Sequence, residues 1–334
     1  MNNGLVDKFG RKHEYLRISV TDRCNLRCAY CMGMEGVPLM DHSKILHYEE
    51  IIKVVRAAAE LGITRIRLTG GEPLARKGLE RLVGGIAEIP GIRDISMTTN
   101  GILLPPMAAT LKKAGLNRVN ISLDSLKPDV YREITRLGNL ADAQAGIFAA
   151  LEHGLHPVKI NVVLMQGVND EEIPSFLRLA QDLPLKVRFI EYMPIDSHDN
   201  EWRGKYLPLQ AVLDKAREMG FPLTLLNQNQ DGGGPAEMYS MPGALGAIGL
   251  IRPISQHFCS ECNRLRLTAE GHIKPCLYWQ DELSVRPVID DPDAVKALLQ
   301  KALDFKRKKH EMSRELLAQE RQDKGHRGMS AIGG

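Results

Sequence analysis

The stretch YEEIIKVVRAAAELGITRIRLTGGEP (residues 48–73) contains, in order, a helix pattern, a glycine and a strand pattern. Ile51, Val54 and Val55 have the i, i+3 and i+4 spacing of an amphipathic helix. Gly62 stands where a helix C-cap belongs, and the β-rich run that follows it ends in two glycines. Repetition of this unit along the chain therefore determines the fold class.

Strand and helix patterns alternate along the first two thirds of the chain. The strand patterns lie at residues 15–20, 63–71, 94–101, 118–124, 158–165 and 186–194. The helix patterns lie at residues 48–62, 78–89, 107–115, 140–154, 171–183 and 207–220. Such alternation predicts a parallel sheet with right-handed crossovers. Six units are two fewer than a closed barrel needs, so we expect an α/β fold, a partial (β/α)6 TIM-type barrel; a doubly wound open sheet is the alternative.

The composition changes after about residue 225. A polar, glycine-rich segment is followed by short strand patterns with a hairpin turn at Glu270–Gly271, and then by an N-capped helix at residues 290–309 with a basic end. We therefore expect two domains. Residues 1–225 would form the barrel, and residues 226–334 a small C-terminal α+β domain covering its open side.

Length and charge exclude several classes of protein. With 334 residues, 43% hydrophobic and 25% charged, the chain can bury a sizeable core. A net charge of +3 is too small to argue for nucleic acid as a partner. The N-terminus has no export-signal pattern, and no apolar run approaches the ~20 residues that span a bilayer. We expect a cytoplasmic protein with no membrane partner.

The six cysteines form two groups of three, namely Cys24, Cys28 and Cys31, and Cys259, Cys262 and Cys276. In a reducing compartment clustered cysteines are more often metal ligands than disulfides. The first group has CxxxCxxC spacing and no fourth cysteine nearby, whereas structural zinc takes four ligands. Three thiolates on an iron–sulfur cube would leave one iron open for chemistry. A zinc site completed by His42 or His47 is the alternative.

Polar and glycine-rich motifs follow the ends of five predicted strands. They are Cys24, GGEP (residues 70–73), TTNG (98–101), SLD (122–124) and EYMP (191–194). The carboxyl ends of parallel strands meet at one edge of a sheet, where α/β proteins bind their ligands. We therefore expect an active site at this edge.

The first triplet, read as CxxxCxYC with Tyr30 before the third cysteine, resembles the signature of radical S-adenosylmethionine (SAM) enzymes. TGGEP resembles the second motif of that superfamily, although the motif alone could be a plain turn. The resemblance implies a [4Fe-4S] cluster whose open iron binds SAM. Reductive cleavage of SAM then gives methionine and a 5′-deoxyadenosyl radical. Gly70 and Gly71 would allow the close backbone approach that SAM requires.

The second triplet has CxxC spacing, followed by thirteen intervening residues and a third cysteine. Alone, it would indicate a zinc ribbon that lacks its partner. Beside the first motif it is similar to the radical SAM family that cyclises GTP in the first step of molybdenum cofactor (molybdopterin) biosynthesis. The resemblance covers essentially the whole chain, including the terminal GMSAIGG. It implies a lyase with a second [4Fe-4S] cluster that binds guanine, and the product (8S)-3′,8-cyclo-7,8-dihydroguanosine 5′-triphosphate.

The same resemblance assigns site residues. For SAM it implies Tyr30, Gly71, Ser122 and Met193. For GTP it implies Arg17, Arg67, Thr98, Lys159, Arg264 and Arg266. For catalysis it implies Arg17, Arg264, Arg266, Gly333 and Gly334.

Each assignment has a plainer alternative. The two arginines at 264 and 266 could lie on a solvated strand face, and Arg67 and Lys159 could form buried ion pairs. Met193 could be ordinary core packing, and the terminal glycines a disordered tail.

The resemblance also implies partners. These are a homodimer, an electron donor such as flavodoxin or ferredoxin, and cyclic pyranopterin monophosphate synthase downstream. Two other functions remain open at this point: a peptide-modifying radical SAM maturase, and a zinc-binding structural protein without catalysis. Metal analysis separates them, because two clusters predict about eight irons per chain.

Overall fold

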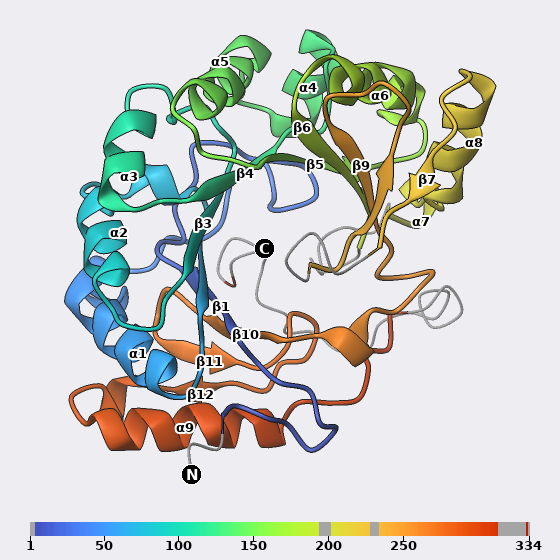
Figure 1. The fold of residues 1–334 in the computed structure, drawn as a ribbon. Helices are drawn as coiled ribbons and strands as arrows, with labels where there is room; N and C mark the ends of the chain where they lie inside the picture. Colours follow the sequence, from blue (N-terminus) through green and yellow to red (C-terminus); the bar gives the residue numbers. More distant parts are fainter. Residues whose placement is uncertain (1–3, 194–201, 228–233, 313–331, 333–334) are drawn as a thin grey trace.

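The computed structural model describes residues 4–193, 202–227, 234–312 and 332 (Figure 1). Six parallel strands stand side by side in chain order. They are β1 (Tyr15–Ser19), β2 (Arg65–Thr69), β3 (Asp94–Thr99), β4 (Arg118–Ser122), β5 (Val158–Leu164) and β6 (Leu185–Glu191). A doubly wound sheet reverses its strand order at a switch point, and this sheet does not. The partial barrel is therefore confirmed.

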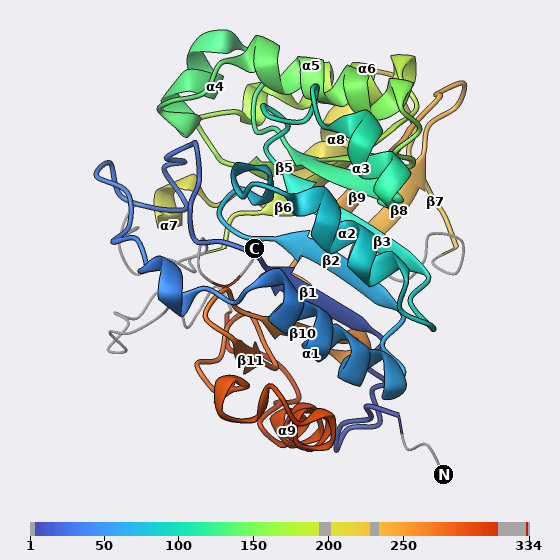
Figure 2. The ribbon, with the colours of Figure 1, turned by 90° about the vertical axis from the view of Figure 1, so that its left-hand side faces the viewer.

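Helices cover the outer face of the curved sheet (Figures 1 and 2). They are α1 (Tyr48–Glu60), α2 (Leu79–Ala87), α3 (Ala108–Ala114), α4 (Pro128–Thr135), α5 (Leu140–Glu152), α6 (Ile173–Asp182) and α8 (Gln210–Glu218). The short α7 (Trp202–Lys205) lies apart from this layer (Figure 2). Gly62, Gly115, Gly154 and Gly220 all have positive φ after a helix, as expected of C-caps. Helix α4 was not expected, because its single apolar stripe is only two turns long.

Alternation along each strand separates the core from the barrel interior. In β1, Leu16 and Ile18 are fully buried against the helices, whereas Arg17 lies between them on the opposite face. The same alternation places Arg67 between Ile66 and Leu68 in β2. The apolar core thus lies between sheet and helices, and the charged side chains lie inside the barrel.

The C-terminal part of the chain extends the sheet at both edges. β9 (Ala247–Ile251) is parallel to β6, and β10 (Arg264–Leu267) is parallel to β1. Antiparallel strands continue outward from them, namely β8 (Glu237–Ser240) and β7 (Thr224–Leu225) on one side, and β11 (His272–Lys274) and β12 (Leu283–Ser284) on the other. One sheet thus crosses residue 225, and the division into domains at that residue stays a prediction.

The last described helix, α9 (Pro292–Asp304), packs beside α1. The side chain of Asp291 caps it, as expected, by accepting hydrogen bonds from two backbone amides. The helix ends five residues before the expected residue 309. The reason is Lys306, whose ammonium is buried and bound to two backbone carbonyl groups, which a solvated helix face would not allow.

None of the helices in the described ranges combines the length and the apolar character that crossing a bilayer requires.

Candidate active site

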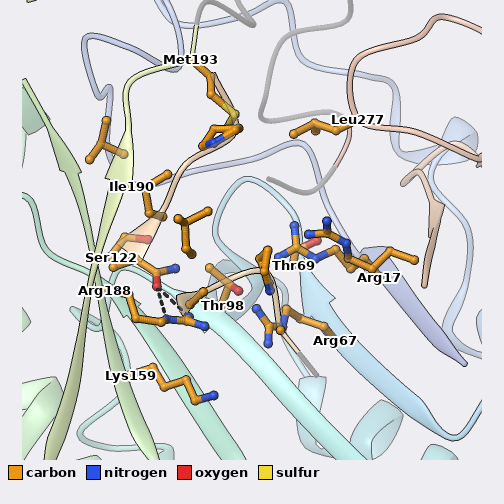
Figure 3. A pocket seen from close by; sticks show the side chains of 18 of the residues that line it. Arg17, Arg67, Thr69, Thr98, Ser122, Lys159, Arg188, Ile190, Met193 and Leu277 are labelled. Atoms are coloured by element: carbon orange, nitrogen blue, oxygen red, sulfur yellow. Dashed lines mark hydrogen bonds between the residues drawn. The ribbon is translucent and has the colours of Figure 1, made fainter. Parts of the chain in front are cut away.

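A cavity of about 940 Å³ opens inside the barrel, lined by side chains from both the N-terminal and the C-terminal parts of the chain (Figure 3). Every expected site residue within the described chain lines it. These are Arg17, Cys24, Cys28, Tyr30, Cys31, Arg67, Gly71, Thr98, Ser122, Lys159, Met193, Cys259, Cys262, Arg264, Arg266 and Cys276. Gly333 and Gly334 lie outside the described residues.

The first cysteine triplet occupies the loop that follows β1. Cys24, Cys28 and Cys31 carry free thiols, and all three are partly buried. The amide of Leu26 donates to the Cys24 Sγ at 3.4 Å. Burial raises the pKa of the Cys24 and Cys28 thiols, so both side chains favour the protonated form until a metal binds them.

The glycines after β2 hold this cysteine loop in place. The Gly71 amide donates to the Thr21 carbonyl oxygen at 2.8 Å, and the Glu72 amide to that of Arg23 at 2.7 Å. A Cβ at Gly71 would stand 2.3 Å from the Arg23 carbonyl oxygen, far inside van der Waals contact. A side chain at this position would therefore push the two loops apart.

The second triplet faces the same cavity from the C-terminal part. Cys259 begins a short 3-10 turn, Cys262 ends it, and Cys276 follows β11. Burial would raise the pKa of the Cys262 thiol, but the neighbouring cations Arg264 and Lys306 lower it to about 6. This cysteine is thus held as a thiolate, the form that binds metal.

Three arginines stand side by side on adjacent strands. In the strand register Arg17 lies between Arg67 on β2 and Arg266 on β10, and all three line the cavity (Figure 3). Burial, together with the positive charge of Arg17, lowers the pKa values of Arg67 and Arg266 well below the usual range of an arginine. Such crowding of buried positive charge is relieved by a bound polyanion, and guanidinium groups suit phosphate oxygens.

The alternatives of a solvated face and an ion pair do not fit these arginines. Arg266 is only 4% exposed. Arg67 donates to the Ser96 hydroxyl at 3.3 Å and lies over the Tyr15 ring at 5.4 Å, and neither contact neutralises its charge. The hydroxyl of Thr98 is buried without a hydrogen-bond partner among the described residues.

Two family models match successive parts of the chain. The Radical SAM superfamily model matches residues 18–180, and the Molybdenum Cofactor Synthesis C model matches residues 185–312.

Curated relatives match almost the whole chain. A protein of Listeria monocytogenes named GTP 3′,8-cyclase is 49% identical over 331 residues, which is 99% of each chain. One of Pelotomaculum thermopropionicum with the same name is 50% identical over 311 residues, 92% of this chain and 95% of that protein. The chain belongs to the GTP 3′,8-cyclase family. Membership implies a radical SAM enzyme with a [4Fe-4S] cluster and SAM.

Solved structures confirm the radical SAM fold of this GTP 3′,8-cyclase family member. Streptococcus suis SuiB bound to its precursor peptide SuiA superposes with a TM-score of 0.62 at 15% identity, over 90% of this chain and 69% of SuiB. Native anSMEcpe with bound AdoMet superposes with a TM-score of 0.59 at 15% identity, over 89% of this chain and 82% of that one.

The donor set of the first triplet fits the [4Fe-4S] cluster of the GTP 3′,8-cyclase family. Three free thiols share one loop, and main chain rather than side chain approaches that loop at Gly71. His42 and His47, the expected zinc ligands of the alternative, are both exposed, and neither lines the cavity. A zinc site built from these residues is therefore not formed.

Of the residues expected to contact SAM, Tyr30 and Gly71 adjoin this triplet, and Ser122 and Met193 line the same cavity. The Tyr30 hydroxyl donates to Asp124 Oδ2 at 2.7 Å, which fixes the ring beside Cys28 and Cys31. Burial raises the pKa of Asp124 to about 6. Ser122 ends β4, and Met193 follows β6 (Figure 3). Met193 lines the cavity at the edge of a small apolar cluster, so part of the core-packing alternative also holds.

Four further cations line the cavity that the sequence analysis did not single out, namely Arg65, Arg118, Lys186 and Arg188. Arg188 donates to Asn161 Oδ1 at 3.1 and 2.7 Å (Figure 3). The sequence contained a signal for three of them, Arg65, Lys186 and Arg188. The i, i+2 spacing of Arg264 and Arg266 recurs in Arg65 and Arg67 and again in Lys186 and Arg188.

Two imidazoles adjoin the second triplet. His257 Nδ1 lies 3.3 Å from His310 Nε2, and the Cys259 Sγ lies within 4.8 Å of both rings' ligand atoms. Within the described ranges, no other His, Cys, Asp or Glu group is so tightly gathered. Sequence spacing could not reveal this pair, because 53 residues separate its members.

Proposed function

We propose that the chain is a GTP 3′,8-cyclase. It converts GTP into (8S)-3′,8-cyclo-7,8-dihydroguanosine 5′-triphosphate, the first step of molybdenum cofactor biosynthesis. The observation that carries the proposal is that two cysteine triplets and a row of buried arginines line one cavity. Relatives of that name match nearly the full length of the chain.

The first triplet and its surroundings would bind the cluster and SAM. Cys24, Cys28 and Cys31 would hold the cluster, and Gly71 lines the same cavity, where its main chain would meet the methionine part of SAM. When bound, the cluster supplies the electron that cleaves SAM. Ser122 and Tyr30, at the same edge of the barrel, orient the adenosine end toward the substrate.

The arginine row would hold the triphosphate of GTP. Arg17, Arg67 and Arg266 provide adjacent guanidinium groups, and Lys159 and Thr98 line the same wall. Fixed at its triphosphate, GTP would present the ribose C3′ hydrogen to the radical. The C3′ radical then attacks C8 of guanine, and one electron and one proton complete the product. Residues that exclude water from the cavity protect these intermediates.

The second triplet would bind a second [4Fe-4S] cluster that holds the guanine. Cys259, Cys262 and Cys276 are free thiols at the cavity wall, and the cations beside Cys262 favour its thiolate. Arg264 lies over the Phe258 ring at 5.1 Å, which places its charge next to this triplet. A three-thiolate site leaves one iron free for the purine.

The terminal Gly333 and Gly334 would enter the cavity to act on GTP, since a chain without side chains fits a narrow channel. Ile332, directly before them, is 2% exposed.

A homodimer, a flavodoxin or ferredoxin as reductant, a downstream cyclic pyranopterin monophosphate synthase and a cytoplasmic location complete the proposal. They rest on the activity of the family alone.

The test is anaerobic incubation of the reconstituted protein with GTP, SAM and dithionite, followed by mass spectrometry of the nucleotide. The proposal expects 5′-deoxyadenosine together with a cyclised isomer of GTP, which has the same mass as GTP and is separated from it by chromatography before mass spectrometry, and which is lost in Cys276→Ser while reductive SAM cleavage continues. Unchanged GTP in the presence of SAM cleavage would contradict it. Zinc without iron in the purified protein would also contradict it.

A further inference from the structure

Lys306 joins two of the strand ends that carry the second triplet. Its side chain is 3% exposed, and its Nζ donates to the carbonyl oxygens of Arg264 at 2.7 Å and Pro275 at 2.9 Å. Arg264 lies two residues after Cys262, and Pro275 directly precedes Cys276. One buried ammonium therefore fixes the backbone beside two of the three cysteines.

Arg11 fixes the third cysteine. Its guanidinium donates to the Cys259 carbonyl oxygen at 2.7 Å, and also to those of Arg307 at 2.9 Å and Lys308 at 3.2 Å. Its Nε donates to Asp7 Oδ2 at 2.7 Å, a pairing buried on both sides. Arg11 thus connects Asp7 near the N-terminus, the Cys259 turn and the segment that carries Lys306.

These two cations are separate from the substrate wall. Neither Arg11 nor Lys306 is among the residues that line the cavity. Both cations contact the second triplet through backbone carbonyl groups. Lys306 also lies close enough to Cys262 for its positive charge to stabilise the Cys262 thiolate. Burying two cations is costly unless their hydrogen bonds and an anion repay it. Asp7 is that anion for Arg11, and a cluster held by three thiolates would be that anion for Lys306.

We propose that Arg11 and Lys306 are positioning residues that assemble the second cysteine triplet into a cluster site, and that the charge of Lys306 raises the reduction potential of that cluster. The inference rests on the proposed function, because it assumes the second cluster. Carbonyl groups held by fixed cations set the spacing of the thiolates before iron arrives. A positive charge beside an iron–sulfur cluster stabilises its reduced state.

The test compares Lys306→Met, Lys306→Gln and Lys306→Arg, with Lys301→Met on the exposed end of α9 as the matched control. Each full-length protein is reconstituted anaerobically. Iron per chain, the EPR spectrum of the reduced protein, the midpoint potential of each cluster and reductive SAM cleavage are then measured. We expect Lys306→Met to fall from about eight to about four irons per chain with SAM cleavage within twofold of wild type. Lys306→Arg and Lys301→Met keep about eight.

Lys306→Gln retains a donor without the charge. It is expected to keep the second cluster at a more negative midpoint potential, with the first cluster unchanged, a signature that a merely structural role would not give. A folded Lys306→Met protein that binds about eight irons per chain would overturn the positioning role. A Lys306→Met protein that loses both clusters to the same extent would also overturn it. An unchanged potential in Lys306→Gln would overturn the electrostatic role. Should Lys306→Met not fold by circular dichroism, the midpoint potential of Lys306→Gln decides the electrostatic role, and the iron content of Arg11→Met, which loses the contact with the Cys259 carbonyl, decides the positioning role.

The wild-type protein separates the two proposals. If it holds only about four irons and forms no cyclised nucleotide, the proposed function fails. If it holds about eight irons and the Lys306 variants match it, only the positioning inference fails.

Discussion

His13 is a fully buried residue whose protonation the fold opposes. Its Nε2 lies 3.0 Å from Asp7 Oδ2, and its Nδ1 has no hydrogen-bond partner among the described residues. Burial and the charge of Lys306 lower the pKa of His13 to about 4, although Asp7 acts in the opposite direction. The neutral imidazole therefore belongs to the folded state.

This residue predicts acid sensitivity of the fold. The folded-state pKa lies below the ordinary value near 6.5, so the unfolded chain takes up the proton first as the pH falls. Stability is complete above about pH 6.5 and declines toward pH 4, by up to about 3 kcal/mol. His13→Gln should flatten the difference in unfolding free energy between pH 7 and pH 5, measured by denaturant titration. His42→Gln, on the surface, should leave that difference as in wild type, and equal slopes in both variants would contradict the account.

Arg266 tests the proposed triphosphate wall. Arg266→Ala removes a charge-assisted contact and should weaken GTP binding by about 1.5–3 kcal/mol, or roughly 10- to 150-fold. Anaerobic equilibrium binding measures this effect. Arg56→Ala, an exposed position on α1, should not change the affinity. Unchanged affinity in Arg266→Ala would remove it from the substrate site.

At the scale of elements, the contact between the GGEP loop and the first cysteine loop is main chain against main chain. Gly71→Ala places a methyl group on the Arg23 carbonyl and should abolish iron binding by the first triplet and reductive SAM cleavage. Gly84→Ala on α2 meets nothing within 4 Å and should stabilise the protein by about 0.5–1 kcal/mol. Iron analysis and thermal unfolding distinguish the two. An active Gly71→Ala would show that this close approach is not needed.

Local sequence patterns predicted most helices and strands. The hydrophobic periodicity of an element, its capping residues and the glycines or prolines that end it all lie within about 15 residues of one another. The six βα units and the hairpin at Gly271 have this property. The patterns did not predict that β9 and β10 would join the barrel in parallel with β6 and β1. More than 200 residues separate β1 from β10, and no local signal specifies such pairing. The early end of α9 was missed for the same reason, since a long-range contact of Lys306 decides it.

At the scale of the whole molecule, the sequence analysis predicted an active site at the carboxyl edge of the strands and metal sites at the two cysteine triplets. In the structure, the expected site residues within the described chain all line one cavity. The His257–His310 pair could not be predicted, because it depends on the path of the segment after α9, whereas the i, i+2 spacing of Lys186 and Arg188 was a signal that the sequence analysis did not use.

The end of the chain carries a further whole-molecule prediction. Deleting Gly333 and Gly334 should reduce cyclisation at least tenfold while iron content and SAM cleavage remain, because the tail is proposed to act on GTP alone. Quantitative mass spectrometry of the cyclised nucleotide measures this. Extending the chain with two alanines should be similarly harmful, and full activity after the deletion would show that the tail is dispensable.

The central claim is that two incompletely ligated iron–sulfur clusters share one substrate cavity. An anaerobic crystal structure of the reconstituted protein with GTP, with maps calculated from iron anomalous scattering, tests it most directly. The account predicts two separate four-iron peaks, one at Cys24, Cys28 and Cys31 and one at Cys259, Cys262 and Cys276, with the nucleotide between them. A single iron peak, or zinc at the second triplet, would contradict it.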